Sequence, residues 1–188
     1  MYHNCDYALF EALNFDGGPL MDKIMVTLSG TWMWIPLYLL ILWLVYRKVG
    51  WRNTFFFLFM MVAAIALSDM ICGIFKSNGL LGGLLPDFTP RLRPMYTEEL
   101  QQTIHIVKFG GKYGTVSAHA ATIASVAVFS ASVIRRWWFT LLVVVSTLLI
   151  CYSRIYLAYH FPIDLAWGLC VGILTGGIMA TVFHKLKR

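Results

Sequence analysis

A histidine and a carboxylate four residues apart suggest nucleophilic chemistry near the C-terminal third of the chain. His160 and Asp164 flank Pro162, a residue that suits the first turn of a helix, so both side chains can lie on one helical face. A carboxylate beside one imidazole nitrogen fixes the tautomer and leaves the other nitrogen free to attack. Arg154, upstream, offers a planar fork of donors to an oxyanion. Such pairs are common on protein surfaces, so this one needs support from other segments.

A second segment supplies an anion site and a proton donor. Ser117 is a good N-cap, and the free N–H groups of a helix N-terminus, beginning at Ala118, bind anions. His119 follows within the same turn and could give a proton to a leaving alkoxide. The alternative is an ordinary polar residue in a helix bundle. Polar residues within a membrane span are costly, however, and that cost favours a functional role.

A third segment adds positive charge through Lys76, Arg91 and Arg93. These bases could simply attract anionic lipid headgroups. Together with Arg154 and the two histidines, a phosphate site explains them better, because such cations stabilise a phosphoryl-transfer transition state without a metal. The four cysteines show no metal-ligand spacing, and we expect them to be small buried residues: Cys5, Cys72, Cys151 and Cys170.

The elements that must position these residues are predicted to be membrane helices. Only 13% of residues are charged, 59% are hydrophobic, and the mean hydropathy is +0.71. We therefore predict an all-α, polytopic membrane helix bundle with about five transmembrane helices in a single domain, 1–188. The predicted spans are 24–46, with a kink at Pro36, then 54–75, 117–134, 137–157 and 163–183. Residues 1–16 are too polar to cross and could form a short interfacial helix, and no cleavable signal peptide is expected.

The charges divide between the two ends of these spans. Eight bases without an acid follow spans one, three and five: Arg47, Lys48, Arg52, Arg135, Arg136, Lys185, Lys187 and Arg188. The positive-inside rule makes that side cytoplasmic. The N-terminus and the candidate site are then expected on the outer, periplasmic face of the cytoplasmic (inner) membrane, with the C-terminus in the cytoplasm. The net charge of +6 does not indicate nucleic-acid binding, because no basic stripe with interleaved aromatics is present.

These residues resemble the signatures of the type 2 phosphatidic acid phosphatase family. Ser153-Arg154, five residues, His160, three residues and Asp164 match the third signature in full. Residues 116–119 resemble the second signature, Pro-Ser-Gly-His, with Val and Ala in place of Pro and Gly. Arg93-Pro94 resembles the end of the first signature. The resemblance covers a core of about 53–184.

One departure concerns the lysine that opens the first signature. The family leaves six residues between it and Arg-Pro, whereas sixteen residues separate Lys76 from Arg93. The Gly/Leu-rich stretch 79–86 is consistent with an insertion and could line an access route for a lipid chain. Either Lys76 loops back to the phosphate or Arg91 substitutes for it.

The resemblance implies a mechanism without a cofactor or metal. His160 would attack phosphorus and form a phosphohistidine while Asp164 holds its ring. His119 would protonate the leaving group and then activate water. Both imidazoles would titrate near neutral pH. The phosphate would be held by Arg154, Arg93, Ser117, Lys76 and the Ala118 backbone. Asp69, near the outer end of span two, is expected either to pair with Lys76 or to cap the helix.

Several functions stay open at this point. The expected substrate is a phosphorylated membrane lipid in the bilayer: undecaprenyl diphosphate, phosphatidylglycerophosphate, phosphatidate or a phosphate of lipid A. A lipid phosphotransferase needs the same pocket, and a non-enzymatic phospholipid-binding membrane protein could retain a degenerate site. The related vanadium haloperoxidases are soluble, which the hydrophobic spans argue against. The sequence does not select a substrate or an oligomeric state.

Overall fold

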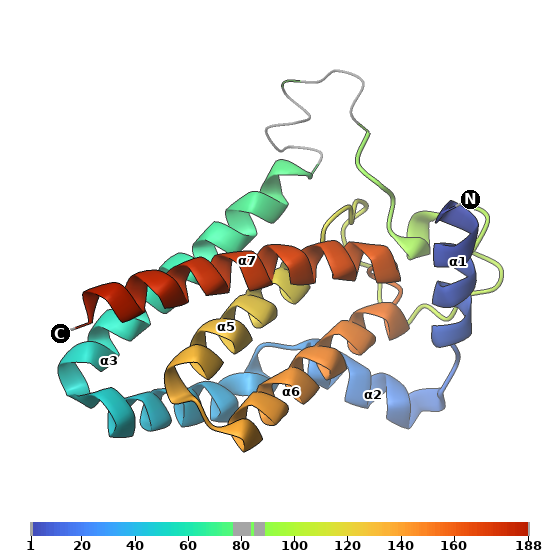
Figure 1. Cartoon of the computed structure of the whole chain (residues 1–188). Coiled ribbons are helices and arrows are strands. Elements are labelled where there is room, and N and C mark those ends of the chain that lie inside the picture. The colour runs from blue at the N-terminus through green and yellow to red at the C-terminus, as the bar shows by residue number, and fades with distance from the viewer. Residues whose placement is uncertain (1, 77–83, 85–88, 188) are drawn as a thin grey trace.

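The computed structural model describes residues 2–76, 84 and 89–187, and these form a bundle of helices (Figure 1). The elements in chain order are α1 (Tyr2–Leu13), α2 (Gly18–Ser29), the 3-10 turn η1 (Trp32–Trp34), α3 (Ile35–Ile74), the 3-10 turn η2 (Pro94–Tyr96), α5 (Ala118–Ile134), α6 (Trp137–Tyr156) and α7 (Pro162–Leu186). Within the described residues, extended pairing is limited to one isolated bridge between Leu92 and Tyr113. The predicted all-α membrane fold is confirmed.

The first predicted span is wrong in its boundaries. The uncharged run 24–46 is not one helix, because α2 ends at Ser29 and a short irregular link leads to η1 and α3. Pro36 lies in the first turn of α3, where its missing N–H leaves no helical hydrogen bond unmade, and not at a mid-helix kink. The bend comes instead at Gly50, whose φ of 77° and ψ of 170° divide α3 into two arms. The later predicted helices agree with α5, α6 and α7 within a few residues.

Among the residues that the structure describes, three helices are long and apolar enough to cross a membrane: 32–74, which contains the Gly50 bend, α6 and α7. The helix α5 is apolar but shorter. Large apolar side chains point away from the bundle along these helices, as they do against lipid: Phe55, Phe59, Val62, Leu141, Leu148 and Leu174. The exact number of crossings stays a prediction.

Small residues bring α5 and α7 into close contact. Gly168, Gly172 and Gly176 repeat every fourth residue on α7 and face the backbone of α5. A Cβ atom at Gly172 would lie 2.2 Å from the Ala121 carbonyl oxygen, so only glycine fits there. In lipid, such small-residue faces let helix backbones pack closely. The contact fixes the first turn of α5 against the first turn of α7, where Ser117 N–H donates to the Asp164 carbonyl at 3.1 Å.

The predicted short N-terminal helix is present as α1, and it packs against the bundle. Phe10 is fully buried and meets Phe161, at the start of α7, edge to face at 5.3 Å between ring centroids. Asn14 follows α1 and donates to the carbonyls of Ile155 and Tyr156 at the end of α6. In Figure 1, α1 lies at the end of the bundle opposite the C-terminus and the bend of α3. Of the cysteines, Cys72 and Cys151 are buried as expected, whereas Cys5 and Cys170 are exposed.

Candidate active site

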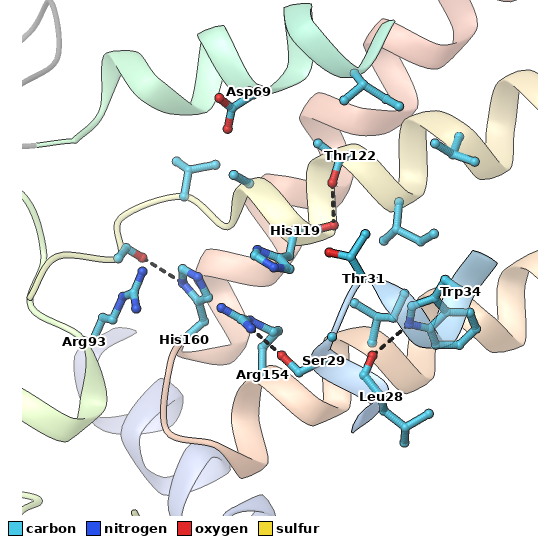
Figure 2. Close-up of a pocket in the computed structure, with 18 of the residues that line it drawn as sticks. Leu28, Ser29, Thr31, Trp34, Asp69, Arg93, His119, Thr122, Arg154 and His160 are labelled. Atoms are coloured by element: carbon cyan, nitrogen blue, oxygen red, sulfur yellow. Dashed lines mark hydrogen bonds between the residues drawn. The ribbon is translucent and has the colours of Figure 1, made fainter. Parts of the chain in front are cut away.

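A cavity of about 560 Å³ opens where the first turn of α5, the end of α6 and the part of α3 that follows Gly50 meet. Figure 2 shows its polar end, where His119, His160, Arg93 and Arg154 gather, with Asp69 on the opposite wall. Six of the predicted site residues line the cavity: Lys76, Arg93, Ala118, His119, Arg154 and His160. Three separate stretches of sequence are thus brought to one place.

His160 is held with one ring nitrogen free. The residue is only 4% exposed, and its Nδ1 lies 3.1 Å from the carbonyl oxygen of Gly114, to which an Nδ1–H donates. That tautomer leaves the Nε2 lone pair available as a nucleophile. Asp164 Oδ2 lies farther from Nδ1, at 3.7 Å. The predicted contact between Asp164 and His160 is therefore present, but at a distance longer than a hydrogen bond. The ring donates its hydrogen bond to the backbone carbonyl of Gly114 instead.

Burial, together with the nearby positive charges of Arg154 and Arg93, lowers the pKa of His160 to about 3. The expectation that this imidazole titrates near neutral pH is therefore wrong. A neutral ring throughout the physiological pH range suits a nucleophile, because protonation would remove the attacking lone pair.

Gly114 lies just before the second predicted segment, and the sequence analysis did not anticipate its role. Its N–H donates to the Arg91 carbonyl at 2.9 Å, and Arg93 N–H donates to the Lys112 carbonyl at 3.0 Å. This pairing sets the Gly114 carbonyl against His160. A Cβ at Gly114 would lie 2.8 Å from Cγ of Arg93 and 3.2 Å from Nδ1 of His160, so the backbone approaches closely. The presence of glycine at this position was the sequence signal that could have indicated such a close backbone approach.

The two arginines of the cavity share an aromatic support that the sequence analysis missed. Tyr159 contacts both, with its ring centroid 4.4 Å from Cζ of Arg154 and 5.5 Å from Cζ of Arg93. Arg93 Nε also donates to the Tyr113 carbonyl at 3.1 Å, and Arg154 donates to the Ser29 hydroxyl. Burial lowers the pKa of Arg93, yet a guanidinium remains charged at physiological pH. Two fixed cations therefore face the same space.

The second predicted segment forms the start of α5. Ser117 caps the helix, since its hydroxyl accepts from Ala120 N–H at 3.4 Å. Ser117 is fully buried and does not line the cavity, whereas Ala118 and His119 do. The expected anion site is thus offered by the first turn of the helix, and direct phosphate binding by the Ser117 hydroxyl stays a prediction.

Asp69, near the C-terminal end of α3, and Lys76, just beyond that end, both line the cavity. Their charged atoms are 3.9 Å apart, and the side chains are 54% and 62% exposed. This is the pairing expected as one alternative for Asp69. Lys76 therefore reaches the site despite its distant place in the sequence. The Gly/Leu-rich stretch 79–86, predicted as an insertion, lies outside the described residues apart from Leu84.

Arg91, the alternative to Lys76, lies behind the site and does not line the cavity. Its guanidinium pairs with Asp6 at 2.7 Å and with Asp164 at 3.2 Å. The expectation that Arg91 substitutes for Lys76 as a phosphate ligand is therefore wrong in this structure. The Arg91 guanidinium is already paired with the carboxylates of Asp6 and Asp164.

Apolar side chains form much of the remaining cavity wall, beside Thr31, Thr115 and Thr122. These apolar side chains come from α2, η1, α3, α5 and α6: Leu28, Trp34, Ile65, Ile123, Val126 and Ile150. A cationic end joined to an apolar wall suits a molecule with a phosphate head and a hydrocarbon part.

Comparison with known proteins agrees with this chemistry. The PAP2 superfamily model matches residues 57–188. A lipid A 4'-phosphatase of Bacteroides thetaiotaomicron is 28% identical over 179 residues, covering 93% of this chain and 76% of that protein. A lipid A 4'-phosphatase of Porphyromonas gingivalis is 29% identical over 177 residues, covering 93% and 71%.

A solved structure shares the fold. The crystal structure of a transmembrane PAP2 type phosphatidylglycerolphosphate phosphatase from Bacillus subtilis superposes with a TM-score of 0.66. The superposition covers 100% of this chain and 88% of the Bacillus subtilis chain, at 16% sequence identity. At that identity the likeness shows the common helical architecture.

Proposed function

Because the chain belongs to the PAP2 superfamily, as the match over residues 57–188 shows, we propose that it is a membrane phosphatase that removes the 4'-phosphate of lipid A. The observation that carries the proposal is the single cavity in which His119, His160 and two arginines meet beside an apolar wall. The substrate is suggested by the two relatives named lipid A 4'-phosphatase, each aligned over 93% of this chain.

The proposed reaction has two steps. Nε2 of His160 attacks phosphorus, and the bond to the sugar oxygen breaks as His119 gives that oxygen a proton. The product is a phosphohistidine, with Asp164 and the Gly114 carbonyl holding the Nδ1 side of the ring. Neutral His119 then takes a proton from water, which attacks phosphorus and releases phosphate and free His160.

The protein's own cations supply the charge that this reaction needs. Arg93 and Arg154 both face the cavity and contact the Tyr159 ring, and Lys76 faces the cavity from just beyond the end of α3. Positively charged donors aimed at the phosphoryl oxygens stabilise the charge that accumulates in the transition state. We therefore propose that hydrolysis does not require a divalent cation.

The orientation of the protein follows from its charges. The bend of α3, the α5–α6 connection and the C-terminus lie together at one end of the bundle, away from α1 and the site (Figure 1). Basic residues gather there, and Lys48 donates to the Ile134 carbonyl at 2.7 Å. By the positive-inside rule that end is cytoplasmic, so the site faces the periplasm from the inner membrane.

Phosphate release by detergent-purified protein tests the proposal. The substrates are lipid A, phosphatidylglycerophosphate, phosphatidate and undecaprenyl diphosphate, all assayed with EDTA. We expect lipid A to be the best substrate, and His160→Ala to lose at least about 1,000-fold in kcat, as nucleophile removal does. His184→Gln is a matched control, because this histidine lies near the opposite end of α7 and contacts the Ser132 carbonyl.

The outcomes separate the alternatives. Release of phosphate from phosphatidylglycerophosphate but not from lipid A would support the proposed phosphatase activity and show that the proposed substrate is wrong. Transfer of phosphate to an added lipid alcohol, without free phosphate, would identify a phosphotransferase. A folded wild-type protein that turns over none of the four lipids would overturn the proposed function.

A further inference from the structure

Arg91 lies between two buried carboxylates on the side of the site that faces away from the cavity. Its Nη2 is 2.7 Å from Asp6 Oδ2, and its Nη1 is 3.2 Å from Asp164 Oδ1. The side chains are 19% exposed for Arg91, 8% for Asp6 and 2% for Asp164. Buried charges of this kind are stable only when each has its partner. The three groups therefore form one charge network that reaches from α1 to the first turn of α7.

The network is oriented by packing. The Arg91 guanidinium lies over the Phe161 ring, with Cζ 3.7 Å from the centroid, and Tyr7 stacks on the same ring at 4.8 Å. Asp6 Oδ1 accepts from Ile163 N–H at 3.1 Å, so the N-terminal helix also caps the backbone of α7. Asp6 therefore has two fixed partners, a side chain and a backbone N–H. The arrangement leaves Arg91 little freedom to turn toward the cavity.

Arg91 and the Phe161 backbone contact different oxygens of Asp164. The Arg91 guanidinium donates to Oδ1, while Oδ2 accepts from Phe161 N–H at 3.0 Å and lies 3.7 Å from His160 Nδ1. The Arg91 backbone carbonyl also accepts from Gly114 N–H, and the Gly114 carbonyl is the acceptor for His160. One residue thus fixes both groups that face the Nδ1 side of the imidazole.

We propose that Arg91 and Asp6 are positioning residues that hold Asp164 and Gly114 against His160 during phosphoryl transfer. The inference rests on the proposed function, in which His160 becomes positively charged when it bonds to phosphorus. Asp6 is the second carboxylate partner of Arg91, so Arg91 is held from both sides while it contacts Asp164. Asp6 lies outside the matched residues 57–188, so the working site of this chain extends into its N-terminal helix.

The test compares kcat and KM of purified Arg91→Gln, Arg91→Lys, Asp6→Asn and the double variant Asp6→Asn/Arg91→Gln. Substrates are lipid A and p-nitrophenyl phosphate, whose hydrolysis does not depend on lipid recognition. Glu11→Gln is the matched control, because it removes an acid from the same helix that contacts only Thr103 among the described hydrogen-bond partners. Thermal unfolding of each variant shows whether it is folded.

We expect Arg91→Gln to lower kcat about 10- to 100-fold with KM within about threefold, the pattern of groups that act in the transition state. Arg91→Lys should retain more activity, since it keeps the charge. Asp6→Asn should lose less than Arg91→Gln. The double variant should lose less than the product of the two single losses, because the residues act as one network. Glu11→Gln should match the wild type.

Three results would overturn the inference. One is a folded Arg91→Gln protein whose kcat stays within about twofold of the wild type, because the inference expects a loss of at least about tenfold. The others are a loss confined to KM and an equal loss in Glu11→Gln. These outcomes leave the proposed function standing, because the wild type remains active. Wild-type protein inactive on both substrates would remove the proposed function and this inference together.

Discussion

The sharpest structural prediction concerns Gly168, where α7 passes the start of α5. A Cβ at this position would lie 2.4 Å from the Ser117 carbonyl oxygen and 2.9 Å from Cβ of Ala120. Ordinary contacts of this kind begin at 3.4 Å, so Gly168→Ala requires the two backbones to separate by about 1 Å. The first neighbour is backbone and cannot turn aside. The change therefore moves the first turn of α5 relative to that of α7.

The size of the effect follows from what those turns carry. His119 belongs to α5 and Asp164 to α7, so the displacement alters the spacing of the catalytic groups directly. A misplacement of about 1 Å can cost on the order of 100-fold in rate. Overpacking of a tight interface costs about 1–3 kcal/mol in stability. We expect Gly168→Ala to fold with a lower melting temperature and to lose between about 10- and 100-fold in kcat.

Gly177→Ala is the matched control, because a Cβ at that position of the same helix meets nothing within 4 Å. Its stability should stay within about 1 kcal/mol of the wild type, and its activity should be unchanged. The assay is phosphate release from lipid A beside thermal unfolding in the same detergent. A Gly168→Ala protein with wild-type kcat and melting temperature would refute the packing argument.

Three further outcomes are expected. Ser29→Ala should lower kcat/KM up to about tenfold, because a hydrogen bond to a charged group such as Arg154 is worth roughly 1.5 kcal/mol; an unchanged value would show that Ser29 does not position it. Asp69→Asn should change phosphate release less than about threefold, since its pairing with Lys76 is exposed and such pairs are weak, and a larger loss would give Asp69 a direct role. Burial depresses the pKa of His160 to about 3 in the folded protein, so the folded state loses stability as pH falls from about 6.5 toward 3. His160→Gln should reduce that loss in thermal unfolding, and equal slopes would contradict the buried neutral ring.

The helices and the catalytic segments were predictable because their signals are local. Hydrophobic runs of sufficient length mark α6 and α7, and the spacing from Arg154 through His160 to Asp164 is a pattern within one connection. The break after Ser29 was not predictable from hydropathy, because no charge or proline interrupts the run there. Gly50 was a usable sequence signal for the bend in α3, because glycine readily adopts the positive φ that the bend requires.

The partners of the site residues depended on long-range packing and were missed. The sequence gives no indication that the Gly114 carbonyl is the nearer acceptor for His160, or that Tyr159 supports both arginines. Asp6 lies 158 positions before Asp164 in the chain and reaches it only through Arg91, once α1 has packed on Phe161. Such contacts between distant segments appear only when the helices are assembled.

Trapping the covalent intermediate tests the central claim most directly. Wild-type protein is mixed with lipid A carrying a labelled 4'-phosphate, quenched in alkali within milliseconds, and mapped by mass spectrometry. We predict a base-stable, acid-labile phosphate on His160, absent from His160→Ala and present at a higher level in His119→Ala, which lacks the base for the second step. A label on another residue, or full turnover with no phosphoprotein and undiminished activity in His160→Ala, would contradict the account.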